Sequence, residues 1–153
     1  MIRLRAILSL GAGAAALLAA TPAAACAPVT VYFDWNSARI EEASRVALER
    51  LAVTLAWKGP DLDHVLLTSH TDSSGSPAAN RAMALRRAAA VRDLLTSYDV
   101  PARLITIRAL GEERPRVRTP ANIREPRNRR VELLIQLSAE AQARQLQEGA
   151  PIC

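Results

Sequence analysis

Residues 70–88, with the sequence HTDSSGSPAANRAMALRRA, contain the features that best predict the fold of this chain. The first part is rich in Ser, Asp and Gly, which favour loops because they satisfy turn geometry. Pro77 suits the first turn of a helix, where its missing N–H is not needed. Apolar residues then recur at three- and four-residue steps, as on the buried face of a helix: Ala84, Ala88, Val91, Leu95 and Tyr98. The stretch therefore predicts a polar loop over residues 69–77 and a helix that ends near Tyr98.

Further strands and one further helix are predicted on both sides of this stretch. Four segments are rich in β-branched, aliphatic or aromatic residues, as strands are: 29–33, 64–68, 104–108 and 130–137. A first helix is predicted from Ser37 or Ala38 to about Trp57, because Gly59-Pro60 ends it. Residues 111–126 contain three prolines and no periodicity, which indicates a loop. The order β-α-β-α-β-β predicts an α+β fold, with a mixed four-stranded sheet and helices packed on one face.

The two ends of the chain do not belong to this pattern. Arg3 and Arg5 precede an apolar run, and Ala23-Ala24-Ala25 supplies the small residues of a cleavage site, so residues 1–25 are predicted to be a secretory signal peptide. The folded domain is then expected over residues 26–138, followed by a C-terminal helix or tail over residues 139–153. Export predicts a location in the periplasm, with association with the outer membrane as a further expectation.

The two cysteines, Cys26 and Cys153, support two hypotheses. An exported protein meets an oxidising compartment, which favours a disulfide between the two ends of the mature chain. In the second hypothesis Cys26, as the first mature residue, carries a lipid, although the Leu that usually stands three places before such a cysteine is missing. Contact with a membrane is expected only in the lipidated case.

Charge and motif content argue against several functional classes. The net charge of +5 falls to about +3 once Arg3 and Arg5 leave with the signal peptide, which does not by itself indicate nucleic-acid binding. The two histidines and two terminal cysteines do not have the spacing of metal ligands. Neither a Gly-rich phosphate loop nor a Gly-x-Ser-x-Gly nucleophile motif occurs. The sequence therefore predicts a protein that is not an enzyme, with no cofactor and no nucleic-acid partner.

Several separated motifs resemble the OmpA-like domain, which also occurs in peptidoglycan-associated lipoproteins and flagellar stator proteins. His70-Thr71-Asp72 begins the main motif, with Asn80 eight residues and Arg87 fifteen residues after the aspartate. Phe33-Asp34 resembles the first strand and turn of the family, and residues 128–132 resemble its closing element. The resemblance extends over residues 29–137 and implies an OmpA-C-like α+β fold.

The resemblance also implies a function, which is non-covalent binding of peptidoglycan through the diaminopimelate of its stem peptide. The far end of meso-diaminopimelate carries an ammonium group and a carboxylate on one carbon. Asp72 is expected to accept hydrogen bonds from the ammonium, and Arg87 to hold the carboxylate with its fork of N–H groups. Asn80 is about two helical turns before Arg87 and is expected on the same face. The resemblance adds three further peptidoglycan-binding candidates at the rim: Thr71, Asp34 and Arg130.

Alternative interpretations of these residues stay open at the level of sequence. Asp72 also suits a loop cap, and Arg87 also suits a solvated helix surface. Trp35 suits either packing over the sheet edge or a platform for a sugar or peptide. The nine arginines between residues 103 and 130 suit a solvated loop or contact with an anionic partner. The alternative function is an adaptor for envelope proteins, with wall binding secondary. For the main hypothesis, Asp72→Ala or Arg87→Ala is expected to abolish binding and leave the fold intact.

Overall fold

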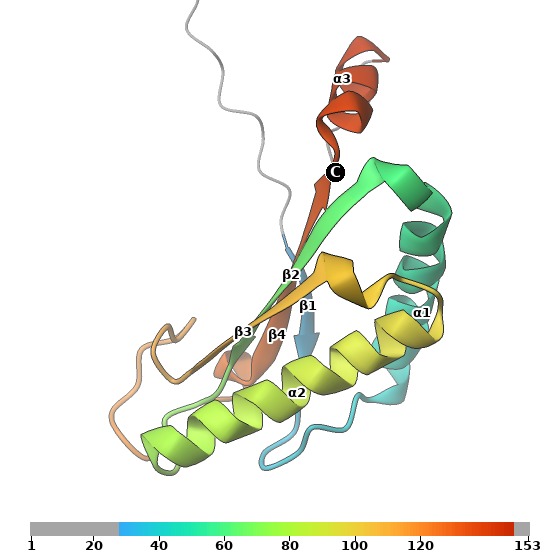
Figure 1. Cartoon of the computed structure of the whole chain (residues 1–153). Helices are drawn as coiled ribbons and strands as arrows, with labels where there is room; N and C mark the ends of the chain where they lie inside the picture. Colours follow the sequence, from blue (N-terminus) through green and yellow to red (C-terminus); the bar gives the residue numbers. More distant parts are fainter. Residues whose placement is uncertain (1–27, 149–153) are drawn as a thin grey trace, which may run out of the picture.

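The computed structural model describes residues 28–148, in which strands and helices alternate before a long loop and a final strand and helix (Figure 1). The regular elements are β1 (Val29–Tyr32), α1 (Glu42–Lys58), β2 (Leu62–His70), α2 (Pro77–Ser97), β3 (Ile105–Gly111), β4 (Arg130–Leu137) and α3 (Ala139–Gln147). Three short 3-10 turns complete the order: η1 (Gly59–Asp61), η2 (Ala102–Leu104) and η3 (Pro126–Asn128). The expected signal peptide and both cysteines, Cys26 and Cys153, lie outside the described residues.

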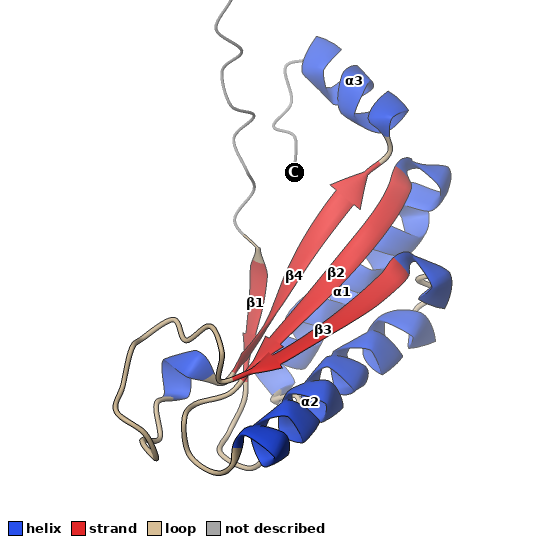
Figure 2. Ribbon diagram, turned by 60° about the vertical axis from the view of Figure 1, so that its left-hand side comes forward, coloured by secondary structure: helices blue, strands red, loops and turns tan. Residues whose placement is uncertain are grey.

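The four strands form one mixed sheet in the order β1-β4-β2-β3 (Figure 2). Strand β4 is antiparallel to both of its neighbours, β1 and β2, whereas β2 and β3 are parallel. Parallel neighbours require a crossover connection, which α2 provides. The predicted α+β fold with a mixed four-stranded sheet is confirmed.

Helices α1 and α2 cover one face of this sheet, where an aliphatic core forms (Figure 2). Leu48 and Leu55 come from α1, and Val91 and Leu95 come from α2. They pack against sheet residues that are also fully buried: Val65, Leu67, Val131 and Leu133. Burial of each such side chain is worth about 1.5–3 kcal/mol. The core therefore forms a firm support for the loops at the end of the sheet.

Helix α1 begins at Glu42, several residues after the predicted start at Ser37 or Ala38. Asn36 adopts a positive φ of 50°, which a helix does not accommodate, and the Ser37 N–H donates to the Asp34 carbonyl to close a turn. The carbonyls of Asp34 and Ser37 then accept hydrogen bonds from Arg87 of α2. Because a distant side chain holds this segment, the local sequence pattern did not predict it.

The loops after β1, β2 and β3 gather at one end of the sheet, and α3 lies at the other end (Figures 1 and 2). The β2–β3 register shifts after Ser69, so that His70 pairs with Gly111. Gly111 has a φ of +59°, and a Cβ there would lie 3.2 Å from the backbone nitrogen of Arg81. The end of β3 therefore approaches the first turns of α2 closely, which only glycine permits at this position.

Helix α3 is present where the sequence predicts a C-terminal helix or tail. The Ser138 hydroxyl accepts from the Ala141 N–H at 3.2 Å and caps the helix. Arg144 then pairs with Asp61 of η1 at 2.5 Å, which ties α3 to the body of the domain. Among residues 28–148, none of the helices combines the length and apolar character needed to cross a bilayer.

Candidate functional site

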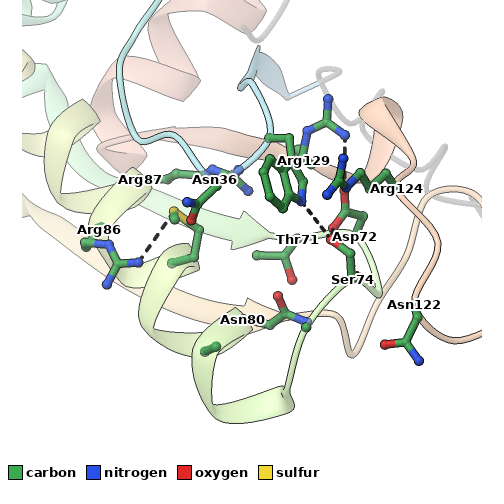
Figure 3. Close-up of a pocket in the computed structure, with 14 residues that line it drawn as sticks. Asn36, Thr71, Asp72, Ser74, Asn80, Arg86, Arg87, Asn122, Arg124 and Arg129 are labelled. Atoms are coloured by element: carbon green, nitrogen blue, oxygen red, sulfur yellow. Dashed lines mark hydrogen bonds and ion pairs between the residues drawn. The ribbon is translucent and has the colours of Figure 1, made fainter.

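A cavity of about 410 Å³ lies at the loop end of the sheet, beside the start of α2 (Figure 3). Its wall combines residues from the β1–α1 turn, the β2–α2 loop, α2 and the loop between β3 and β4. Its charged and hydrogen-bonding side chains include Thr71, Asp72, Asn80, Arg86, Arg87, Arg124 and Arg129. Four of the six residues predicted to bind peptidoglycan therefore line a single cavity: Asp72, Arg87, Asn80 and Thr71.

Asp72 is a buried carboxylate, with a relative exposure of 3%. Its Oδ2 accepts a hydrogen bond from Arg129 Nη1 at 3.1 Å, which forms a buried ion pair. Its Oδ1 accepts from the Ser74 hydroxyl at 2.6 Å and from the Ser74 N–H at 3.3 Å. The short loop after β2 therefore fixes the carboxylate in the way a loop-capping Asp is fixed, while the side chain still lines the cavity.

Arg87 is also buried, with a relative exposure of 1%. Its Nε donates to the Ser37 carbonyl at 2.9 Å, and its Nη2 donates to the Asp34 carbonyl at 2.9 Å. Its Nη1 donates to the His70 carbonyl at 3.3 Å, and the guanidinium lies over the Phe33 ring at 5.4 Å. Arg87 thus connects the turn after β1 to the end of β2.

The pKa of Arg87 is lowered to about 10, mainly by burial and also by the nearby positive charge of Arg129, while Asp72 acts in the opposite direction. The guanidinium stays protonated at neutral pH, since this pKa is still well above 7. A guanidinium has five N–H groups, so the three bonds to carbonyls leave part of its donor capacity for a ligand.

Asn80 and Thr71 contact the end of β3. The Asn80 side chain donates to Glu112 Oε2 at 2.5 Å, which orients its amide. The Thr71 N–H donates to the Gly111 carbonyl at 2.9 Å and continues the contact between the two parallel strands. The Thr71 hydroxyl is buried and has no hydrogen-bond partner among the described residues, although Thr71 lines the cavity. An unsatisfied buried hydroxyl beside a cavity is a suitable position for a polar group of a ligand.

The other two predicted residues do not line this cavity. Asp34 contributes its carbonyl to Arg87, but Asp34 itself is exposed and lines a separate depression with Glu41 and Arg127. Arg130 is buried and pairs with Glu132 at 2.7 Å. Peptidoglycan binding by Asp34 and Arg130 therefore stays a prediction, and their positions outside the cavity do not support it.

Arg129 lines the cavity but was not among the residues predicted from the sequence, whereas Arg130 was predicted and does not line it. The alternation of the last strand is a signal that separates the two residues. Val131 and Leu133 are buried against the helices, and residues two apart on a strand face the same side. The same alternation assigns Arg129 to the helix-covered side and Arg130 to the opposite side. Arg129 also donates from Nε to the Phe33 carbonyl at 3.0 Å, which fixes its position.

Trp35 forms one side of the cavity and is about half exposed. Its Nε1–H donates to the Ser74 hydroxyl at 3.2 Å, so it belongs to the hydrogen-bond chain that ends at Asp72. The guanidinium of Arg124 stacks over the indole at 3.6 Å from the ring centre. Such a cation–π contact is worth about 0.5–1 kcal/mol at an exposed site. Loop residue Arg124 and turn residue Trp35 therefore close the cavity as a pair.

His70 lies next to the site but offers little chemistry. Its pKa is lowered to about 4, mainly by burial and also by the charge of Arg130, while Glu132 acts in the opposite direction. The imidazole is therefore neutral at physiological pH, and both ring nitrogens are buried. No cluster of three or more potential metal ligands occurs among residues 28–148.

Residues 32–129, which include strands β2 and β3 and every residue that lines the cavity, match the OmpA family. The chain belongs to the OmpA family. Outer membrane protein A of Yersinia pseudotuberculosis is 34% identical over 104 residues, which are 68% of this chain but only 30% of that protein. This member of the family therefore spans about a third of the length of that relative, and the activity of the whole relative does not transfer directly.

Solved structures of OmpA-like domains have the same fold. The peptidoglycan-associated lipoprotein from Burkholderia pseudomallei superposes with a TM-score of 0.63 at 29% identity, over 70% of this chain and 89% of that one. The C-terminal domain of Helicobacter pylori MotB superposes with a TM-score of 0.65 at 21% identity, over 78% and 92% of the two chains. The latter likeness is one of fold alone.

Proposed function

We propose that this OmpA-family domain binds peptidoglycan non-covalently by holding the free end of meso-diaminopimelate in the cavity, and so acts as an anchor or scaffold in the cell envelope. The observation that supports this most directly is that Asp72 and Arg87, fifteen residues apart in the sequence, line the same cavity. A zwitterionic end group needs one anion and one forked cation near each other, and this pair supplies both.

The ammonium group of the ligand is assigned to Asp72 and Thr71. The Asp72 carboxylate already accepts from Arg129 and Ser74, but each of its oxygens can accept more than one hydrogen bond. The Thr71 hydroxyl has no partner among the described residues and is suited to accept from the same ammonium. A carboxylate and a hydroxyl together favour a primary ammonium over a neutral group.

The carboxylate of the ligand is assigned to the guanidinium of Arg87, with Arg129 as a second cation. Arg87 offers the N–H groups that its three carbonyl bonds leave free, and its burial strengthens a bond to an anion. Asn80, held by Glu112, supplies an amide at the same wall. A stem peptide with lysine in place of diaminopimelate has the ammonium but lacks this carboxylate, so we expect it to bind more weakly.

The names of the relatives agree with this function and with the location expected from the sequence. One is an outer membrane protein, one is a peptidoglycan-associated lipoprotein, and MotB structures are described as a periplasmic domain. We therefore place this protein in the periplasm, near the outer membrane. We propose binding without cleavage, which predicts that purified sacculi release no soluble fragments when incubated with the protein.

Thr71→Val is the sharpest test of the site. It removes a hydroxyl that has no partner among the described residues, so we expect little change in the free energy of unfolding. It also removes one hydrogen bond to the ligand, and we expect about a fivefold loss of affinity for diaminopimelate-type stem peptides. Asp72→Ala is expected to abolish co-sedimentation with diaminopimelate-type sacculi. Arg103→Ala, at the other end of β3, is the matched control and should bind as the unmodified protein does.

The result that would overturn the proposal is full retention of sacculus binding by folded Asp72→Ala protein. Equal affinity for diaminopimelate and lysine stems would contradict the assignment of Arg87 to the carboxylate at the free end of diaminopimelate. It would leave wall binding itself in place. Release of fragments from the sacculi would replace binding with hydrolysis.

A further inference from the structure

The charges around the cavity are not balanced by the ligand proposed above. Four guanidinium groups line the cavity, those of Arg86, Arg87, Arg124 and Arg129, and Asp72 is the single acidic residue among the lining residues. The free end of diaminopimelate is a zwitterion, so its binding leaves the excess of positive charge unchanged. A ligand that brings additional negative charge would be held more strongly.

Two of the four arginines have partners within the protein, and two are available. Arg129 pairs with Asp72, and Arg87 donates to three carbonyls. Arg86 and Arg124 form no ion pair with an acidic side chain among the described residues: Arg86 contacts the Met83 sulfur at 3.9 Å and Arg124 stacks on Trp35. Both are exposed.

The two available arginines lie on opposite sides of the cavity, Arg86 on α2 and Arg124 on the loop before β4 (Figure 3). Thr71, Asp72 and Asn80 lie between them in the same view. A peptide whose diaminopimelate end enters the cavity would leave its neighbouring residues at the mouth, within the field of these two cations.

We propose that Arg86 and Arg124, on opposite sides of the cavity, attract the carboxylates of the same stem peptide that adjoin diaminopimelate, and so make the domain prefer stems in which these carboxylates are free over stems in which they are amidated. This inference rests on the proposed function. Two carboxylates adjoin diaminopimelate: the α-carboxylate of the preceding glutamate, which is joined through its side chain, and the terminal carboxylate of the peptide. Both have the same chemistry, and guanidinium groups suit either of them.

The test measures binding of soluble stem peptides by calorimetry at low ionic strength. Three ligands are compared: one with both carboxylates free, one amidated at the glutamate, and one amidated at the terminus. We expect the unmodified protein to bind the free form about three- to fivefold more tightly than at least one amidated form, as is typical of exposed ion pairs. The amide that lowers affinity identifies the carboxylate. High salt should reduce the preference, because it screens exposed charges.

The variants assign the preference to residues. Arg86→Gln and Arg124→Gln should each reduce the preference for the free form and leave the affinity for the amidated form nearly unchanged. Arg124→Lys keeps the charge and should keep most of the preference, which separates charge from packing on Trp35. Arg103→Gln is the control and should retain the full preference, since Arg103 lies at η2, away from the cavity.

Equal affinity of the unmodified protein for all three peptides, with Asp72→Ala still abolishing binding, would overturn this inference and preserve the proposed function. A preference that persists unchanged in both glutamine variants would also overturn it. Absence of binding to every diaminopimelate peptide would instead refute the proposed function.

Discussion

Arg87 has a structural role that the sequence did not indicate, and Arg87→Ala tests it. The substitution removes a buried guanidinium that donates to the carbonyls of Ser37, Asp34 and His70. The first two carbonyls belong to a partly exposed turn, so water can replace much of each bond at a net cost of about 1 kcal/mol. The His70 residue is buried, and its carbonyl would lose a donor with less access to water, at about 1–3 kcal/mol.

We predict that Arg87→Ala lowers the free energy of unfolding by about 3–5 kcal/mol, in the range seen when one partner of a buried charged contact is removed. For a domain of this size each kcal/mol lowers the melting temperature by about 3–5 °C, so a loss of about 10–20 °C is expected. This result would correct the expectation from sequence that the variant leaves the fold intact. Arg87→Lys should recover only part of the loss, because one ammonium group cannot reach three carbonyls on two segments.

The assay is urea unfolding followed by far-UV circular dichroism, with the slope of the transition required to stay constant between variants. Arg86→Ala is the matched control, because Arg86 is the neighbour of Arg87 on α2 and its side chain is exposed. This variant should change the free energy of unfolding by less than about 0.5 kcal/mol. A free energy of unfolding for Arg87→Ala within about 1 kcal/mol of the unmodified protein would refute the reasoning. It would mean that the carbonyl bonds contribute little and that the Arg87 guanidinium is available mainly to ligand.

Three further predictions concern the residues that hold the site in place. Gly111→Ala should lower the free energy of unfolding by about 2–3 kcal/mol in the same urea assay, because it combines a positive φ with a contact of 3.2 Å. Gly59→Ala, which has a positive φ but open space, should lower it by only about 1–2 kcal/mol. Equal losses in the two variants would contradict the role of the contact at Gly111. The Asn128 side chain forms hydrogen bonds of 2.8 Å with both the N–H and the carbonyl of Val117. Asn128→Ala should therefore lower the free energy of unfolding by about 2 kcal/mol and speed proteolysis within residues 112–126. An unchanged cleavage rate would count against a role of Asn128 in holding this loop. The His70 pKa is lowered to about 4 from 6.5, so the unfolded chain binds the proton first and stability should fall as pH decreases from about 6.5 towards 4 and stay level above this window. A His70→Gln variant should lose this part of the pH dependence, as measured by urea titrations at several pH values, and an unchanged slope would show that other groups cause it.

The positions of strands and helices could be predicted because they depend on local chemistry. Pro77 and the polar residues before it mark the start of α2, and the structure adds that the Ser76 hydroxyl accepts from the Ala79 N–H to cap it. Strand β4 has the predicted bounds, since a run of strand-forming residues is a property of a short segment. The predicted start of α1 was wrong, because the turn before this helix is held by hydrogen bonds from Arg87, which is distant in sequence.

The candidate site also combines features that local sequence predicts with features that depend on distant residues. The spacing of Asn80 and Arg87 was sufficient to predict that they share one face of α2, because a helix has a fixed repeat, whereas the place of Asp72 beside them was predicted from the family resemblance. Strand alternation places Arg129 and Arg130 on opposite sides of the sheet, but only the tertiary structure shows that Arg129 lines the cavity and pairs with Asp72. The burial of Arg87, the stacking of Arg124 on Trp35 and the outward position of Asp34 arise where three loops meet at the end of the sheet. Local sequence determined the elements and the spacing of the charged residues, whereas only the packing of distant segments decided which charges face each other, because burial and pairing depend on neighbours in space rather than along the chain.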